Sequence, residues 1–272
     1  MSKINSEILA RIKSFPPLPE SVAEIQKICS NQDAGISDLA KVVNKDPMLT
    51  ANLLKAANSP LYGFSKEITN INQAVSLFGM ATVKGFALAS AVRDSVKIDM
   101  SPYGTDTDGF SNTAQLQNAL MLNWYAKVDR KKIDILAPAS FLDGVGQIII
   151  AAETIAQKKS SDFKKDVQNF ENEIEEVEKK YFDITSQEIA SEIFTKWKLE
   201  SLMVSAIAQS NSPKDAQEEV KPYAYALKIV RTAINIREKF SEKGIKKALE
   251  LVKEANLSSE AFLEAIKIVN PS

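Results

Sequence analysis

The segment Asp106-Thr107-Asp108-Gly109 has the residue types of a calcium-binding loop, since closely spaced carboxylates are the ligands that Ca²⁺ prefers. An EF-hand loop beginning at Asp106 would need glycine at position 111 and glutamate at position 117. The chain has Ser111 and Gln117 there. We therefore interpret residues 97–112 as a polar loop without a calcium site.

The chain of 272 residues contains no histidine. Histidine is the usual proton shuttle near neutral pH and the commonest metal ligand in proteins. Its absence excludes Ser-His-Asp and Cys-His catalytic relays and zinc sites with histidine ligands. The single cysteine, Cys29, excludes intramolecular disulfides and CxxC metal sites. Because Val22, Ile25 and Cys29 share one face of an expected helix, we interpret Cys29 as a buried structural thiol.

The net charge of −1 balances 34 basic residues against 35 acidic residues. The molecule therefore has no overall field that would attract it to nucleic acid, and we predict no nucleic-acid partner. The acidic run at 171–178 is interrupted by Ile174 and Val177 at helical spacing. Its carboxylates are therefore expected on the solvated faces of a helix rather than in a cation site.

The sequence also lacks the usual signals for a membrane or for export. No stretch approaches 18 uninterrupted apolar residues, and the N-terminus, Met-Ser-Lys-Ile-Asn, has no apolar signal segment. We therefore expect a cytoplasmic protein without a membrane partner.

Helix signals run through nearly the whole chain, whereas 9 glycines and 10 prolines leave little room for the tight turns of a β protein. Asp46-Pro47 and Asn70 have the residue types of helix starts, and Thr185 with Glu188 forms a capping box. The predicted fold class is therefore all-α. In the second half we expect helices at 113–128, 138–157, 162–180, 186–198, 200–210, 220–240, 242–255 and 259–269.

Four segments of the first half form a specific pattern through their order and spacing. They are Phe15-Pro16-Pro17-Leu18-Pro19-Glu20, Asp46-Pro47-Met48-Leu49-Thr50, residues 53–63 and residues 68–79. Through them residues 10–215 resemble the HDOD family, HD-related output domains of bacterial signalling proteins that are related to the His-Asp metal phosphohydrolases. The resemblance implies two packed helical lobes, about 10–96 and 113–215, the second similar to an HD-domain helical core. Residues 216–272 are then C-terminal helices packed on the second lobe.

The family motif in the first lobe also has a purely structural interpretation. Its residues are Asp46, Pro47, Asn58, Ser59, Pro60, Tyr62 and Gly63. The Asp, Asn and Ser side chains are typical helix caps, and the Pro and Gly residues suit turns. We favour this structural interpretation over a recognition surface, which rests on analogy with the family.

The resemblance further indicates where an HD domain would carry its metal site. Residues 141–148 are similar to the Leu-His-Asp-Ile-Gly-Lys segment, with Asp143 at the His position, Gly144 at the Asp position and Gln147 at the Lys position. The pairs Gln117-Asn118 and Ser210-Asn211 stand where the resemblance implies a His-Ser pair and paired histidines. We call these seven residues the vestigial positions: Gln117, Asn118, Asp143, Gly144, Gln147, Ser210 and Asn211.

Among these ligand positions Asp143 is the single anionic residue, which is too little for a catalytic metal. We therefore expect no metal, no cofactor and no catalytic residue. Gly146, within the same segment, is expected to permit close packing of helices.

The leading hypothesis is a non-catalytic signalling module that acts by binding another signalling protein, through a helical surface or the cleft between the lobes. A second hypothesis is a residual metal-dependent phosphohydrolase with a metal site built on Asp143. A third is a sensor that binds a nucleotide or another small ligand in the vestigial cleft, with Trp197 stacking on it and Lys196 and Lys198 neutralising it. We favour instead a core position for Trp197, with both lysines reaching water.

Overall fold

The computed structural model describes residues 6–62, 64, 66–96, 98–169 and 173–271. Over these residues the fold is all-α, as predicted, and the one strand-like pairing is an isolated bridge between Ile234 and Lys239. The α-helices are α1 (Ser6–Ser14), α2 (Glu20–Cys29), α3 (Ile36–Val43), α4 (Pro47–Ala57), α5 (Ile71–Phe78), α6 (Met80–Ser95), α7 (Thr107–Val128), α8 (Ile133–Leu142), α9 (Gly146–Ala156), α10 (Ser160–Gln168), α11 (Ile174–Phe182), α12 (Ser186–Lys196), α13 (Ser201–Ala208), α14 (Lys221–Ala233), α15 (Glu242–Glu254) and α16 (Ser259–Val269). Short 3₁₀ helices are η1 (Pro60–Tyr62), η2 (Ser101–Tyr103), η3 (Arg130–Lys132) and η4 (Pro213–Asp215).

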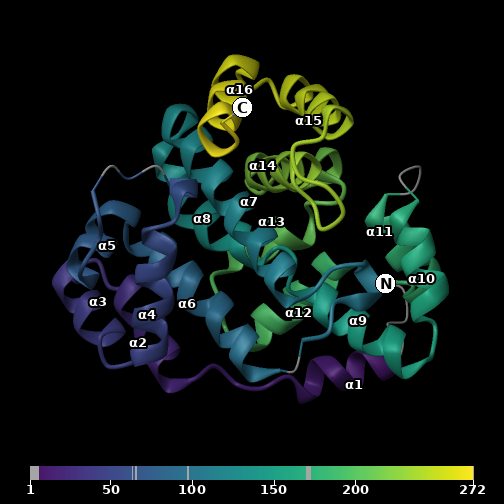
Figure 1. The fold of residues 1–272 in the computed structure, drawn as a ribbon, viewed down its shortest axis with the longest axis horizontal. Coiled ribbons are helices and arrows are strands. Elements are labelled where there is room, and N and C mark those ends of the chain that lie inside the picture. Colours follow the sequence, from purple (N-terminus) through teal and green to yellow (C-terminus); the bar gives the residue numbers. More distant parts are fainter. Residues whose placement is uncertain (1–5, 63, 65, 97, 170–172, 272) are drawn as a thin grey trace.

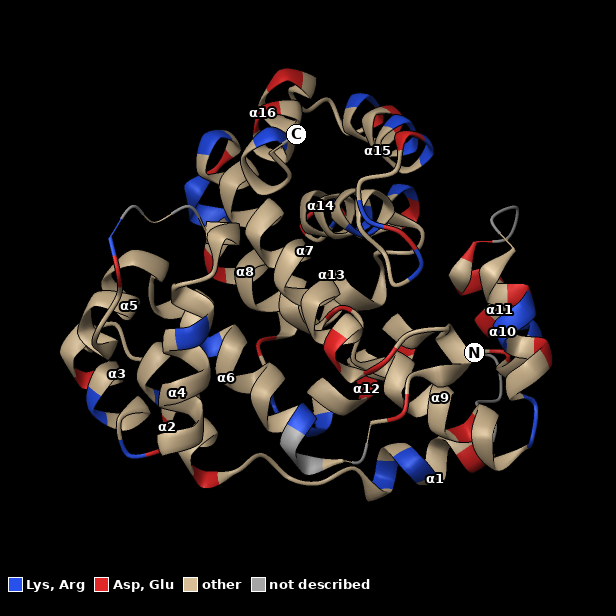
Figure 2. Ribbon diagram, in the orientation of Figure 1, with Lys and Arg blue, Asp and Glu red and all other residues tan. Residues whose placement is uncertain are grey.

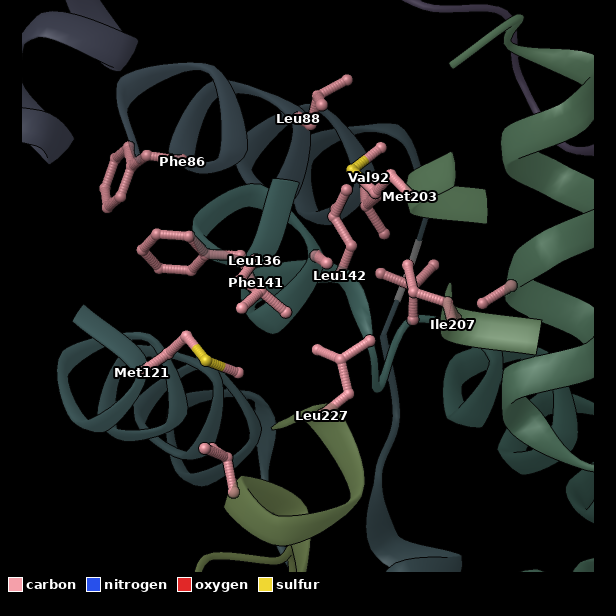
Figure 3. Packing of buried hydrophobic residues seen from close by; sticks show 14 of the residues in the cluster. Phe86, Leu88, Val92, Met121, Leu136, Phe141, Leu142, Met203, Ile207 and Leu227 are labelled. Atoms are coloured by element: carbon pink, nitrogen blue, oxygen red, sulfur yellow. The ribbon is translucent and has the colours of Figure 1, made fainter. Parts of the chain in front are cut away.

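Helices α2 to α5 pack around α6 on one side of the molecule, and the helices from α7 onward form the larger side (Figure 1). The two sides are joined where α6 packs along α8, the largest helix–helix interface in the described chain. Gly85 makes this close approach possible, since a Cβ there would lie 2.5 Å from the Cα of Pro138. One hydrophobic core therefore runs through both sides. Figure 3 shows its centre, with Phe86, Leu88, Val92, Met121, Leu136, Phe141, Leu142, Met203, Ile207 and Leu227 labelled.

The N-terminal segment ties the two sides together from the outside. Helix α1 packs on α9 and α12 of the larger side, whereas α2 packs on α3 and α6 (Figure 1). Between them, the buried Trp197 donates its indole N–H to the Pro16 carbonyl at 2.9 Å. The Lys196 ammonium donates to the carbonyls of Lys13 and Phe15 at 2.7 and 2.8 Å. These groups therefore hold the N-terminal segment, and Lys196 does not simply extend into water.

The C-terminal helices form a layer over the larger side (Figure 1). Helix α14 packs on α7, α8 and α13, and α15 packs on α14 and α16. Helix α16 packs on α7 and also contacts η1 from the first-lobe motif. On the helices seen in Figure 2, basic and acidic segments are interspersed, in line with the near-zero net charge.

Several predicted boundaries were wrong. Residues 97–112 are not all loop, because α7 begins at Thr107 and the Asp106 carboxylate caps it by accepting from the Gly109 N–H at 2.7 Å. The expected helix at 138–157 is two helices, α8 and α9, and Pro138 lies inside α8 rather than at a helix start.

Of two further predicted helices, one is divided into two helices and the other ends earlier than expected. The helix at 162–180 is α10 and α11, with residues 170–172 outside the described chain. The helix at 220–240 ends at Ala233. A hairpin-like turn follows, in which Asn235 donates its backbone N–H to the Glu238 carbonyl and Phe240 donates to the Ala233 carbonyl, each at 2.9 Å.

One stretch of the described chain, Arg130–Ala156, has the length and apolar composition of a membrane-spanning helix. It consists of η3, α8 and α9, and 89% of its apolar window is buried inside the protein. Helices α5 and α6 pass the same test only as a pair, and they are bent by 111° relative to each other. This pattern is typical of core helices, which are apolar because they are covered by other helices.

Candidate functional site

A small cleft lies between α7, the α8–α9 turn, α11, α12, α14 and α15. Gln117, Asp143, Gly144 and Gln147 line it directly. The cavity volume is about 60 Å³, which is room for a few water molecules. Four of the seven residues to which the resemblance pointed therefore lie at one cleft.

An arginine that the sequence analysis did not single out lies at the centre of these residues. Arg231, on α14, donates from Nη1 to Asp143 Oδ2 at 2.5 Å and to Ser210 Oγ at 3.1 Å. From Nη2 it donates to the Ser210 carbonyl at 3.3 Å and to Asn211 Oδ1 at 2.7 Å. The side chains of Arg231 and Asp143 are 12% and 3% exposed. This is a buried, charge-assisted hydrogen-bond network.

A sequence signal for Arg231 does exist. Ala224, Leu227 and Arg231 follow one another at i, i+3 and i+7, so the arginine lies in line with the buried face of α14. A charged residue in such a stripe indicates a buried partner of opposite charge. The partner, Asp143, is 88 residues away, and no local pattern identifies it.

Burial and neighbouring charges act in opposite directions on the pKa values of Arg231 and Glu175. Burial would lower the pKa of Arg231, but the carboxylates of Asp143 and Glu175 outweigh burial and raise it. Burial would also raise the pKa of Glu175, yet Lys228, with which it forms an ion pair, and Arg231 lower that pKa to about 2. The site therefore contains a permanently charged guanidinium and an ionised Glu175 at neutral pH.

Glu178 behaves in the opposite way on the wall of the same cleft. The prediction that the carboxylates of the acidic run lie on solvated faces was wrong for this residue, because α11 buries it completely. Its carboxyl oxygens accept from the Tyr103 hydroxyl and from the Ser186 N–H, each at 2.7 Å. Both hydrogen bonds favour the ionised form, but complete burial dominates and raises the pKa of Glu178 to about 7.

Two other vestigial side chains, those of Gln117 and Asn118, are bound to protein groups. Gln117 donates to the carbonyl of Ile234 at 2.8 Å, just after α14. Asn118 donates to the Ala137 carbonyl at 2.9 Å and accepts from the Tyr62 hydroxyl at 3.3 Å. The Tyr62 contact links the first-lobe motif to a vestigial position.

This arrangement does not fit a catalytic metal, although the HD-type fold implies one. Among the described residues, no group of three His, Cys, Asp or Glu side chains lies close enough together to hold an ion. The one carboxylate at a vestigial position, Asp143, already contacts a cationic guanidinium, which would repel a metal ion. The remaining vestigial side chains offer neutral amide or hydroxyl oxygens, which are weak ligands.

The first-lobe motif has the capping roles expected from the sequence. Asp46 Oδ1 accepts from the Leu49 N–H at 3.0 Å at the start of α4, where Pro47 is the first helical residue. Asn58 ends α4 and forms two hydrogen bonds with the backbone of Ile68, at 2.9 and 2.8 Å.

The motif residues Ser59, Pro60 and Gly63 follow Asn58 in the sequence. Ser59 Oγ accepts from the Leu61 N–H at 3.4 Å, and Pro60 begins η1. Gly63 lies outside the described residues.

Cys29 is half-buried, and burial raises its pKa to about 11. Its thiol donates to the Met80 carbonyl at 3.6 Å. These properties agree with a structural thiol that is too rarely ionised to act as a nucleophile.

Comparison with known proteins gives consistent matches over the whole fold. A virulence factor from Campylobacter jejuni subsp. jejuni, known from a crystal structure, is 30% identical, with 97% of each chain covered and a TM-score of 0.60. A "Putative phosphohydrolase" from Shewanella amazonensis SB2B has the same fold at 21% identity, with a TM-score of 0.73 over 97% of this chain and 93% of that chain. An HDOD domain protein with unknown function from Geobacter sulfurreducens also has this fold, at 14% identity and a TM-score of 0.61 over 96% of each chain.

Sequence comparison adds a partial relative and a family. A protein of Treponema pallidum (strain Nichols), named "Uncharacterized protein", is 34% identical over 79 residues. The matched part is 29% of this chain and 15% of that protein. The family model of the HDOD domain matches residues 15–213. The chain therefore belongs to the HDOD domain family.

Proposed function

We propose that this chain is a non-catalytic signalling module of the bacterial cytoplasm that acts by binding another protein. The observation that carries the proposal is the ion pair between Arg231 and Asp143. The guanidinium of Arg231 is paired with Asp143, which has the one carboxylate at a vestigial position. Membership of the HDOD family, whose domains are outputs of bacterial signalling, supports the signalling role.

The cleft supports neither a nucleotide sensor nor a hydrolase. Sites for drug-sized ligands usually enclose about 300 Å³ or more, and this cleft has about 60 Å³. The residues considered for nucleotide stacking, Trp197 and Lys196, are engaged with the N-terminal segment. A metal-dependent hydrolase would need a metal at the vestigial positions, and the one carboxylate there, Asp143, is paired with Arg231.

The first lobe is the part of the surface on which we place the partner. Ile36, Met48 and Leu77 are large apolar side chains on α3, α4 and α5, and each is more than one-third exposed. Met48 is the most exposed of them, at 65%, and it follows the motif residues Asp46 and Pro47 at the start of α4. Exposed methionine is common on protein-binding surfaces because its side chain adapts to a partner.

Met48→Glu is expected to weaken partner binding at least about tenfold while the fold stays intact, because a charge replaces an exposed apolar contact. The full chain would be immobilised to capture its partner from the native cell extract, and the affinity of the purified partner would then be measured. Ile268→Glu on α16 is the matched control, since Ile268 is 45% exposed in the C-terminal layer. Repeated captures without a partner would count against the proposal, and equal loss of affinity in both variants would exclude Met48 as part of the surface.

A further inference from the structure

The vestigial positions hold a part of the chain that lies beyond the family match. The HDOD match ends at residue 213, whereas Arg231 and Ile234 belong to the C-terminal segment. Arg231 donates hydrogen bonds to Asp143, Ser210 and Asn211, and the carbonyl of Ile234 accepts one from Gln117. In this chain, the side chains at the positions where an HD domain would carry metal ligands thus contact the C-terminal segment.

The shape of the contact favours a guanidinium over other cations. A guanidinium is planar and presents five N–H donors in fixed directions. Asp143 and Asn211 accept from its two different Nη atoms, while Ser210 accepts from both, through its hydroxyl and its carbonyl. The single nitrogen of a lysine could not reach all these acceptors from one position.

In the described part of the chain, the C-terminal helices also form two ion pairs with α11, and in the first of these the side chains of Lys228 and Glu175 are 17% and 18% exposed. Lys247 and Glu173, at the start of α11, lie 2.5 Å apart with side chains 44% and 42% exposed. Such surface pairs contribute little to stability because water and salt screen them. Arg231 is the most deeply buried cation of these three pairs, at 12% exposed with a partner carboxylate at 3%, so its loss should matter most.

We propose that Asp143, Ser210 and Asn211 form a guanidinium-binding socket, which Arg231 fills from within the chain and which docks helices α14–α16 onto the larger side. The former metal position has thereby become an internal docking site for the C-terminal segment. This inference is independent of the proposed partner, because it concerns contacts within one chain.

Removal and replacement of the guanidinium in the full-length protein test the socket. We expect Arg231→Ala to lower Tm on the order of 5 °C, because Asp143 is left buried without its partner. Guanidinium chloride at about 10 mM should then raise the Tm of this variant, because a ligand that binds only the folded state stabilises it. This concentration is far below the molar range in which guanidinium unfolds proteins.

Three controls separate the socket from general effects. Equal concentrations of NaCl and of urea, the neutral isostere of guanidinium, should give no such rise. The double variant Asp143→Asn/Arg231→Ala should lose the response, and Arg130→Ala, at an exposed arginine, should never show it. If Arg231→Ala does not accumulate as folded protein, the yield of its refolding from urea is measured instead, and the yields with each of the same additives are compared. A guanidinium effect no larger than that of NaCl, or one equally large in the double variant, would overturn the proposal.

Discussion

Gly146→Ala is expected to destabilise the protein by at least about 3 kcal/mol, although alanine is the better helix former by about 1 kcal/mol. Gly146 is the first residue of α9, and a Cβ there would lie 1.9 Å from the carbonyl oxygen of Ser186 at the start of α12. The obstacle is backbone, which no rotamer change can move. The free energy of unfolding, measured by urea denaturation, gives the difference.

Gly144→Ala is the matched control, two residues earlier in the same turn. A Cβ there would meet side-chain atoms of Gln147 and Phe110 at 3.4 and 3.5 Å, which is ordinary contact. We expect a change within about 1 kcal/mol. Similar losses in both variants would show that the turn, rather than the α9–α12 contact, is what the substitution disturbs.

Glu178→Gln is expected to stabilise the protein by about 3 kcal/mol at pH 8, with the gain disappearing towards pH 4.5. Burial raises the pKa of Glu178 from 4.5 to about 7 in the folded protein. Between these values the folded state keeps a proton that the unfolded state has released, so stability falls as the pH rises through this window. Above pH 7 the folded protein carries the full cost of a buried carboxylate. Glutamine removes this cost, and its amide can still accept from Ser186 and donate to Tyr103.

Glu153→Gln should show the opposite sign. Burial opposes ionisation of Glu153, but hydrogen bonds from Arg11 and Gln157 overcome it and lower the pKa. Its contribution to stability is therefore present at neutral pH and is lost as the pH falls through the lowered pKa. Urea denaturation at pH 4.5, 6 and 8 tests both variants. A stability difference for Glu178→Gln that does not vary with pH would refute the assigned pKa.

Local features of the fold could be predicted because they depend on residues three or four apart. Asn70 accepts from the Gln73 N–H at 3.0 Å, and Thr185 and Glu188 form the expected reciprocal capping box. The role of Gly146 in close packing is confirmed by its contact with Ser186. Asp106 has the same capping geometry, but its neighbours Asp108 and Gly109 also suit a turn, and the helix start was missed.

The candidate site could be predicted only in part, for a different physical reason. The family resemblance located Asp143, Ser210 and Asn211 through their positions in matched segments. Arg231 lies outside every matched segment, and its role depends on how α14 packs against α8 and α13. Such packing brings together residues whose spacing in the sequence carries no period, so propensity and pattern do not reveal it.

A cation of the protein itself, Arg231, binds Asp143, Ser210 and Asn211, where an HD domain would carry metal ligands. The most direct test is the metal content of the full chain after it has been equilibrated with Mn²⁺, Fe²⁺ and Zn²⁺ and unbound ions have been removed. Turnover of cyclic dinucleotides and nucleoside phosphates is measured on the same samples. We predict far less than one ion per chain and no turnover. One tightly bound ion per chain, with turnover that Asp143→Ala abolishes, would contradict the account.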